Sequence, residues 1–255
     1  MLLSNKMNSP WDFRQGMFIL VSFIVVYCSL SAGHMLLVKA TVGFDNYLKN
    51  DTDFYTKVLL GGQIIKAMAI LIAIKFVALN RYQLNWEALG FVKTSTQWIL
   101  VAVFISLIGL VLRFLLMKWM VTEVPAWIPF VQPPLKDLAI SFSILTFFLI
   151  FTVVITPIVE EIFFRGFLFK WFAGRKPIWL AALISSAMFG ASHIIPPQAI
   201  SAALMSFLII YLYVASGSIW PPIVCHIVNN ALSIVGNLLA STHLLPDFLM
   251  PPGIS

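Results

Sequence analysis

Long apolar stretches dominate this chain and constrain its fold more than any other feature. A helix needs about 20 mostly apolar residues to cross a bilayer, and a soluble domain carries about 25% charged residues, whereas this chain carries 10% and has a mean hydropathy of +0.96. The sequence predicts seven spans, near residues 17–41, 58–79, 98–118, 138–172, 177–195, 198–216 and 219–240. We therefore expect an all-α integral membrane protein, a polytopic bundle of about seven transmembrane helices.

The predicted spans leave no segment long enough for a separate soluble domain, so residues 1–255 are expected to form a single membrane domain. The first stretch, 17–41, is too long for a signal-peptide core and is predicted to be a true span. Cytoplasmic loops carry an excess of Lys and Arg, and Arg81, Lys93 and Arg175 would lie in such loops if the N-terminus were inside. The pattern predicts a cytoplasmic N-terminus. No basic patch indicates a nucleic-acid partner, although the net charge is +6.

Ionisable residues are rare in the later apolar stretches, and three of them occur together. Glu160 and Glu161 are adjacent within ITPIVEEIFFRGFLF, and Arg165 follows four residues after the second acid. A charged group in hydrocarbon is costly and is a functional-site hypothesis by default. Two further polar sites follow in the apolar stretches: His193 alone, and His226 with Asn230.

Helix geometry predicts that these polar residues lie at one depth. Glu160 is about 21 Å from the turn at Gly174, and His193 on the returning helix is about 22 Å from it, at 1.5 Å per residue. His226 and Asn230 are four residues apart and share one helix face. We expect the group to meet inside the bundle, nearer the cytoplasmic side.

The spacing of the charged residues predicts different roles for the two acids. Glu161 and Arg165 stand at i and i+4 and are predicted to form a salt bridge. Glu160 is rotated by about 100° from Glu161, so it is expected to point elsewhere, into a watery cavity.

These residue types favour hydrolysis of an amide bond. A carboxylate such as Glu160 near the imidazole of His193 acts as a general base on water, and His226 and Asn230 are candidate hydrogen-bond donors to a developing oxyanion. Carboxylate and imidazole are also ordinary zinc ligands, so Glu160, His193 and His226 are candidate metal ligands. The sequence has no HExxH motif, no intramembrane Asp pair and no GxSxG elbow, which disfavours other peptidase chemistries.

The order of these residues resembles a known family. Three motifs occur in successive apolar stretches: Glu160-Glu161-x-x-x-Arg165, Phe189-x-x-x-His193 and His226-x-x-x-Asn230. The pattern is similar to that of the CPBP family, which comprises CAAX proteases and bacteriocin-processing enzymes and is also called Abi or type II CAAX endopeptidases. The resemblance covers residues 138–240, which would be the catalytic core, and residues 1–137 would be accessory transmembrane helices.

The resemblance implies an intramembrane endopeptidase with its active site within the bundle. Glu160 and His193 would activate water, His226 and Asn230 would form the oxyanion site, and Glu161 with Arg165 would support them. Members are described both as metalloproteases and as metal-independent glutamate proteases. A mechanism that requires no cofactor is favoured here, and zinc stays open.

The expected partners are a peptide or membrane-protein substrate and the lipid bilayer, with no nucleic acid. Prenylated CaaX proteins, bacteriocin leaders and signalling peptides all fit as substrates. A bacterial cell membrane is the favoured location, and the sequence does not predict an oligomeric state.

Two alternatives remain open from the residues alone. The acids with Arg165 fit a buried structural ion cluster, and the histidines fit interhelical hydrogen bonding. The chain would then be a non-catalytic membrane protein that acts in bacteriocin immunity, scaffolding or transport. Lys66 and Arg113 also lie deep in the first spans, where acids or lipid headgroups are candidate partners, and the sequence assigns them no role. Gly190 is expected to permit close contact between helices.

Overall fold

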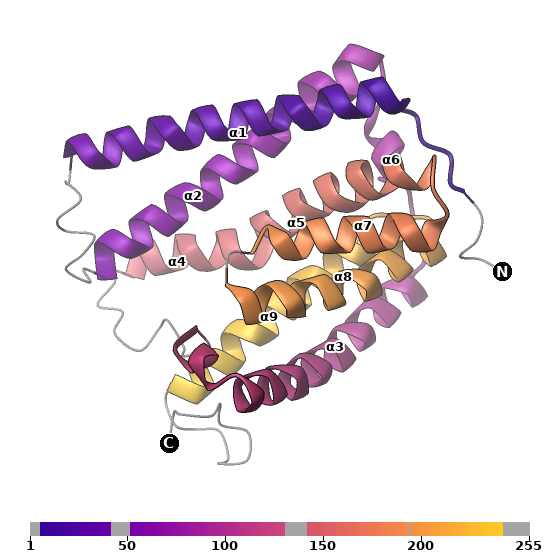
Figure 1. The fold of residues 1–255 in the computed structure, drawn as a ribbon. Helices are drawn as coiled ribbons and strands as arrows, with labels where there is room; N and C mark the ends of the chain where they lie inside the picture. The colour runs from indigo at the N-terminus through magenta and orange to yellow at the C-terminus, as the bar shows by residue number, and fades with distance from the viewer. Residues whose placement is uncertain (1–5, 42–51, 131–141, 194, 242–255) are drawn as a thin grey trace.

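The computed structural model describes residues 6–41, 52–130, 142–193 and 195–241. Within these ranges the chain is helical and has no strand (Figure 1). The α-helices are α1 (Phe13–Thr41), α2 (Thr52–Ile72), α3 (Thr96–Glu123), α4 (Phe142–Ile150), α5 (Thr156–Glu161), α6 (Lys170–Ala173), α7 (Ile178–Ala191), α8 (Pro196–Ser216) and α9 (Trp220–Ser241). The π-helical segments are η2 (Ala73–Leu79), η6 (Phe151–Ile155) and η7 (Ile162–Phe169), and the 3-10 segments are η3 (Asn80–Tyr82), η4 (Trp86–Leu89) and η5 (Pro125–Phe130).

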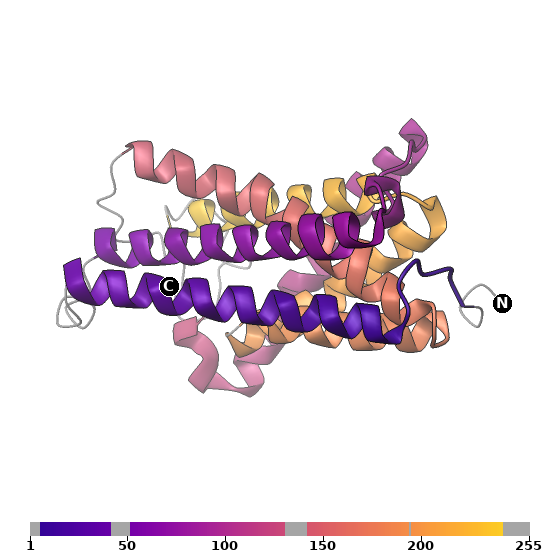
Figure 2. The ribbon, with the colours of Figure 1, turned by 90° about the horizontal axis from the view of Figure 1, so that it is seen from above.

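A long central rod organises the bundle. The segments from α4 to α6 follow one another without a break, and α5 in the middle contacts α2 and α9. The helices α1 and α2 run antiparallel along one side, as Figures 1 and 2 show. On the other side α7 packs against α8, and α3 packs against α8 and α9. The rod therefore runs through the interior, where all eight residues of η7 are buried.

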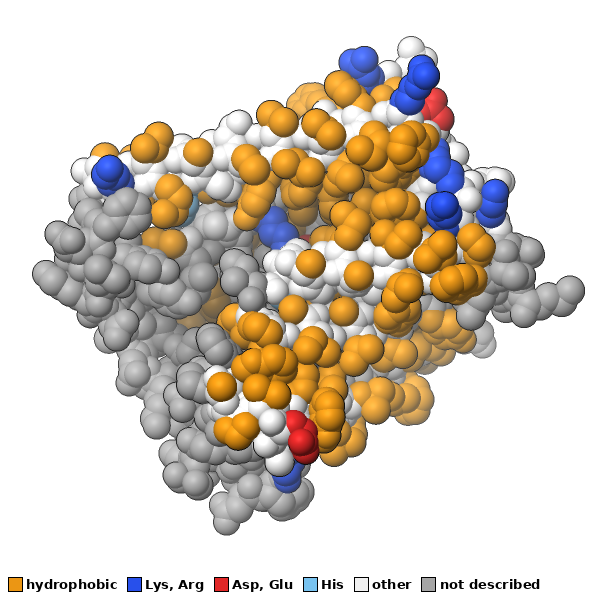
Figure 3. Space-filling view, in the orientation of Figure 1, with side chains coloured by type: hydrophobic (Ala, Val, Ile, Leu, Met, Phe, Trp, Pro, Cys, Tyr) orange, Lys and Arg blue, Asp and Glu red, His pale blue; other side chains and the backbone are white. Residues whose placement is uncertain are grey.

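The all-α polytopic membrane bundle is confirmed. Six helices of the described residues are long and apolar enough to cross a membrane, and large apolar side chains cover much of the face in Figure 3. The predicted span 177–195 is too long: α7 ends at Ala191 after 14 residues, about 21 Å. Residues 138–141 of the predicted span 138–172 lie outside the described residues.

The early end of α7 has a local cause. The Ser192 hydroxyl donates to the carbonyl of Phe189 at 2.7 Å, a side-chain bond that competes with continued helix. The next helix begins with Pro196, and the residue before a proline is disfavoured in helical geometry. The chain therefore turns directly after Ser192, at His193.

The returning helix pair α7–α8 packs closely because of one glycine. A Cβ atom at Gly190 would lie 2.6 Å from the carbonyl oxygen of Ala199 and 2.8 Å from the Cβ of Ala203. Only a residue without a side chain permits this approach. The predicted role of Gly190 in close helix contact is confirmed, and it fixes α7 on α8 one turn before His193.

Candidate active site

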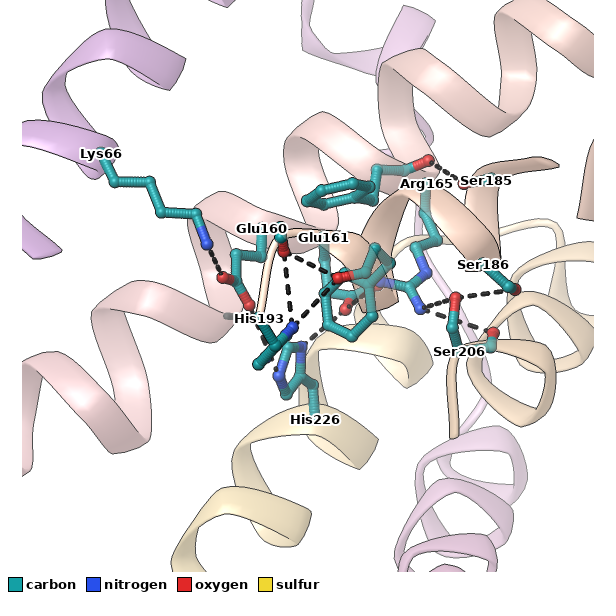
Figure 4. Close-up of polar contacts among 12 residues, drawn as sticks. Lys66, Glu160, Glu161, Arg165, Ser185, Ser186, His193, Ser206 and His226 are labelled. Carbon is teal, nitrogen blue, oxygen red and sulfur yellow. Dashed lines mark hydrogen bonds and ion pairs between the residues drawn. The ribbon is translucent and has the colours of Figure 1, made fainter. Parts of the chain in front are cut away.

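The two acids lie on the short helix α5, between two π-helical segments of the rod. Both residues are almost fully buried, at 3% exposure for Glu160 and 0% for Glu161. Pro157 lies inside the rod just before them and follows η6. Isolated π turns are frequent at functional sites, and here they flank both acids. Figure 4 shows that Lys66 from α2 and His226 from α9 meet the acids, and that Ser186 from α7 and Ser206 from α8 lie beside Arg165.

Arg165 and Glu161 form the predicted salt bridge. Arg165 Nη1 donates to Glu161 Oε1 at 2.9 Å, and both side chains have no exposed surface. The other terminal nitrogen, Nη2, donates to the Ser206 hydroxyl on α8 at 2.8 Å. Ser186 Oγ on α7 in turn donates to Ser206 Oγ at 2.9 Å. The guanidinium thereby links the rod to α7 and α8 in a dry interior.

Glu161 has a second partner that the sequence did not indicate. His226 on α9 donates through Nδ1 to Glu161 Oε1, at 2.7 Å, so one carboxylate oxygen serves both Arg165 and His226. This bond orients the ring of His226 and leaves Nε2 facing Glu160, whose Oε2 lies 3.7 Å away. Glu161 therefore orients the imidazole of His226 in addition to forming the predicted salt bridge with Arg165.

Glu160 is paired with Lys66, a contact that sequence reasoning missed. Lys66 Nζ on α2 donates to Glu160 Oε1 across 94 residues of sequence. The side chain of Lys66 retains 24% exposure, whereas that of Glu160 has 4%. The only sequence signal was the depth of Lys66 in an apolar stretch, which did not identify its partner. The site therefore includes a residue from outside the predicted core 138–240.

His193 lies directly after α7, beside the ring of Phe189. Its Nδ1 is 3.0 Å from the carbonyl oxygen of Phe189, and the two rings meet edge to face with centroids 5.1 Å apart. The same phenyl ring contacts His226 at 5.7 Å and the Arg165 guanidinium at 4.7 Å. The ring of Phe189 thus contacts both His193 and His226. Among the described residues no hydrogen bond joins His193 to Glu160, and Nε2 of His193 has no hydrogen-bond partner there.

Asn230 is held by the backbone of the rod. Its Nδ2 donates to the carbonyl of Thr152 at 2.9 Å. In η6 the N–H of Thr156 bonds to the carbonyl of Phe151, five residues back, so the corresponding partner of Thr152 would be the N–H of residue 157. That residue is proline and has no N–H. Asn230 therefore satisfies a carbonyl that Pro157 leaves free, and its second amide hydrogen is available for another acceptor.

This arrangement predicts that Asn230 and Pro157 are energetically coupled. Asn230→Ala should destabilise the protein by about 1 kcal/mol, because it leaves the partly buried carbonyl of Thr152 unpaired. In a Pro157→Ala background the loss should shrink, since the rod then supplies its own N–H. Thermal unfolding of the four proteins of this double-mutant cycle in detergent measures both effects. Equal losses in the two backgrounds would contradict the coupling.

A cavity of about 430 Å³ opens beside this cluster. Its polar lining includes His193, His226, Asn229 and Asn230, and most of the remaining wall is apolar and comes from α3 and α8. Glu160 is not among the residues that line this cavity, and the expectation that it faces a watery cavity stays a prediction. The contact with Lys66 holds one oxygen of its carboxylate toward α2, and the other, Oε2, lies 3.7 Å from Nε2 of His226.

The candidate metal ligands do not converge on one point. Within the described residues no group of three His, Cys, Asp or Glu side chains has a geometry that would hold a metal ion. The carboxylate of Glu160 already holds Lys66, and Nδ1 of His193 lies against a backbone carbonyl.

The fold and the cluster define a class of protein: a multi-pass membrane protein with a buried acid–imidazole site inside its bundle. Residues 142–232 match the family model for type II CAAX prenyl endopeptidase, Rce1-like. An 85-residue segment is 32% identical to the Bacillus subtilis (strain 168) protein named "Putative membrane peptidase YdiL". Through this region the chain is similar to members of the CPBP family.

The similarity is confined to part of each chain. The aligned segment covers 33% of this chain and 35% of the Bacillus subtilis relative, so the chain spans about a third of the length of the curated relative it matches. No solved structure matches the chain. The matched residues contain all three motifs and leave out α1, α2 and α3, so the helix that carries Lys66 lies outside them.

Proposed function

We propose that this protein is an intramembrane endopeptidase that hydrolyses a peptide bond with water activated by Glu160. The observation that carries the proposal is the buried cluster in which both acids lie within reach of the His226 ring, at 3.7 and 2.7 Å, beside a cavity in an apolar bundle. Buried charge of this density stabilises a fold poorly and is characteristic of intramembrane sites that perform chemistry.

In the proposed reaction Glu160 is the base. Lys66 holds Oε1 of Glu160, and Oε2 removes a proton from a water molecule while the water oxygen attacks the scissile carbonyl. His193, through its Nε2, orients that water. When the C–N bond breaks, Glu160 returns the proton to the leaving amine. General acid–base catalysis of this kind contributes about 10²–10⁴-fold in rate.

The proposed oxyanion site consists of His226 and Asn230. Because Nδ1 of His226 donates to Glu161, Nε2 is a donor only when the ring carries both protons, and this role requires that form. Asn230 uses one amide hydrogen on Thr152 and offers the other. Each donor contributes roughly 2.7–4 kcal/mol to transition-state stabilisation.

The finer location and substrate are also part of the proposal. Basic side chains gather at the end of the bundle where α1 begins and α6 ends (Figure 3), which supports a cytoplasmic N-terminus by the positive-inside rule. A bacterial cell membrane, a peptide or membrane-protein substrate and no required cofactor complete the proposal. Bacteriocin leaders and prenylated tails both fit the apolar cavity.

Mass spectrometry of membrane peptides tests the function and identifies the substrate in the same experiment. Cells that express the protein or its Glu160→Gln variant at equal levels are compared, and cleavage products specific to the unaltered protein are expected. Purified protein, with and without a chelator, then cleaves a peptide that spans such a site. Identical peptide profiles in the two cell lines would overturn the proposal.

We predict that Lys66 is a positioning residue for Glu160. Lys66→Met should reduce kcat by roughly 10–100-fold with little change in KM, because the base loses the cation that holds its carboxylate. Lys66→Arg restores the charge and should recover most of the activity, which a role in packing alone would not predict. Steady-state kinetics on the identified peptide measure both variants. If Lys66→Met has as high a kcat as Lys66→Arg, the assignment of Lys66 as a positioning residue is contradicted.

A non-catalytic function has one observation in its favour. Each acid of the cluster is paired with a base, Glu160 with Lys66 and Glu161 with Arg165, as in a structural ion cluster. In that case the protein would act in immunity, scaffolding or transport. A cellular phenotype that survives Glu160→Gln, together with unchanged membrane peptides, would favour this second candidate.

A further inference from the structure

Arg113 is a charged residue that the proposed reaction does not use. It lies on α3, and its Nη1 donates to the hydroxyl of Ser233 on α9 at 2.6 Å. The guanidinium therefore points toward the bundle interior and does not extend to a membrane interface. Among the described residues no carboxylate lies within ion-pair distance of it. Arg113 thus differs from Arg165 and Lys66, each of which has an acidic partner.

A guanidinium without an acidic partner is costly at this place. Arg113 is about 25 Å along α3 from its start and about 15 Å from its end, within a helix that is long and apolar enough to span a membrane. A cation in hydrocarbon costs several kcal/mol unless an anion or water compensates it. A single hydroxyl partner from Ser233 does not neutralise the charge. The position therefore favours the binding of an anionic group.

Arg113 also lines the cavity that contains the two histidines. Its neighbours on the wall are mainly apolar, including Leu112, Leu116 and Leu208. Ser233 lies seven residues after His226, so it is on nearly the same face of α9 and about 10 Å farther along the helix. An anion at Arg113 would thus lie in the same cavity as the reacting bond but two helical turns away from it.

We propose that Arg113 forms a subsite for a carboxylate of the peptide substrate. Arg binds carboxylates through parallel hydrogen bonds that combine charge with fixed geometry, and apolar side chains of the same peptide fit the apolar wall. The carboxylate anchors the peptide while the bond near His226 is cleaved. A peptide can supply this carboxylate in two ways, as its C-terminal α-carboxylate or as an Asp or Glu side chain. This inference rests on the proposed peptidase function and names its specificity residue.

Binding of short apolar peptides to the purified protein in detergent tests the subsite without any need for cleavage. The probes are acetyl-Ala-Leu-Ile-Leu as the free acid, the same peptide as the C-terminal amide, and an amide in which Glu replaces Ile. The thermal shift and the Kd are measured for the unaltered protein, Arg113→Met and Arg113→Lys. Arg81→Met is the matched control, because Arg81 lies against Phe18 and outside the cavity.

We expect the free acid to bind roughly 10–100-fold more tightly than the amide, as for a hydrogen bond to a charged group. Arg113→Met should abolish this preference for the free acid. Arg113→Lys should retain part of it, and the control Arg81→Met should retain all of it. Tight binding of the Glu-containing amide would assign the side chain as the source. Equal binding of acid and amide by the unaltered protein would overturn the subsite.

Two further outcomes separate this inference from its alternatives. Dodecyl phosphate is the probe for a lipid headgroup. If it binds more tightly than every peptide acid and this binding depends on Arg113, the site takes a lipid headgroup and the proposal is overturned. If the peptide acids bind as expected but Glu160→Gln leaves membrane peptides unchanged, the subsite stands and the peptidase function fails. If cleavage depends on Glu160 but acid and amide bind equally, only the subsite fails.

Discussion

Glu160→Gln should lower the rate of peptide cleavage by about 10²–10⁴-fold, because glutamine keeps the shape of the side chain but cannot accept the proton of the attacking water. The expected loss is in kcat, since Glu160 does not line the cavity that would bind the peptide. Kinetics on the peptide identified by mass spectrometry measure it. Glu87→Gln is the matched control, because Glu87 is an exposed acid outside the cluster.

The substitution also leaves Lys66 without its counterion, so a fold effect must be separated from a catalytic one. The double variant Glu160→Gln/Lys66→Met removes both charges and should fold at least as well as Glu160→Gln alone. It should be equally inactive. A double variant that regains cleavage would show that Glu160→Gln acted through the unpaired lysine and that the base is another group.

Arg165→Leu should destabilise the protein by about 3–5 kcal/mol, the usual cost of leaving one member of a buried ion pair unpaired. Both partners have no exposed surface, so solvent does not compensate Glu161. The lost bonds to Ser206 add to the effect. Unfolding in detergent, followed by helical circular dichroism, measures the free energy of unfolding. Arg14→Leu is the control, because Arg14 is exposed on α1.

A double-mutant cycle identifies the cause of this destabilisation. Glu161→Gln/Arg165→Leu removes both charges, so it should be less destabilised than the sum of the two single variants. Additive losses would mean that the pair contributes no interaction energy and that Arg165 acts by packing alone. The cycle is informative even if the proposed catalysis is wrong, because it concerns only the salt bridge.

The sequence predicted those contacts that local helix geometry determines. The salt bridge from Glu161 to Arg165 follows from their i, i+4 spacing, and the close approach at Gly190 follows from the absence of a side chain. The polytopic bundle follows from the apolar stretches, because a bilayer leaves few alternatives to helices. In each case the feature is determined by residues that are close together in the sequence.

Contacts between distant helices could not be predicted in this way. Lys66 and Glu160 are 94 residues apart, and nothing local distinguishes Lys66 from Arg113 as the partner of that acid. The bond from His226 to Glu161 depends on how the rod is rotated, and the π-helical turns change that rotation from the regular 100° per residue. The bond from Asn230 to Thr152 uses a carbonyl for which Pro157, 73 residues before Asn230, supplies no backbone donor.

The short helix α7 has a consequence for hydration. The turn between α7 and α8 ends well before the far ends of α1 and α2 (Figure 1), so the backbone at Ser192 and His193 leaves helical geometry within the thickness that neighbouring helices span. Irregular backbone at that depth is tolerated only against protein or a water-filled cavity. A cavity of about 430 Å³, large enough to hold water, borders His193. In the proposed reaction, the short helix α7 would therefore let water reach a depth from which hydrocarbon otherwise excludes it.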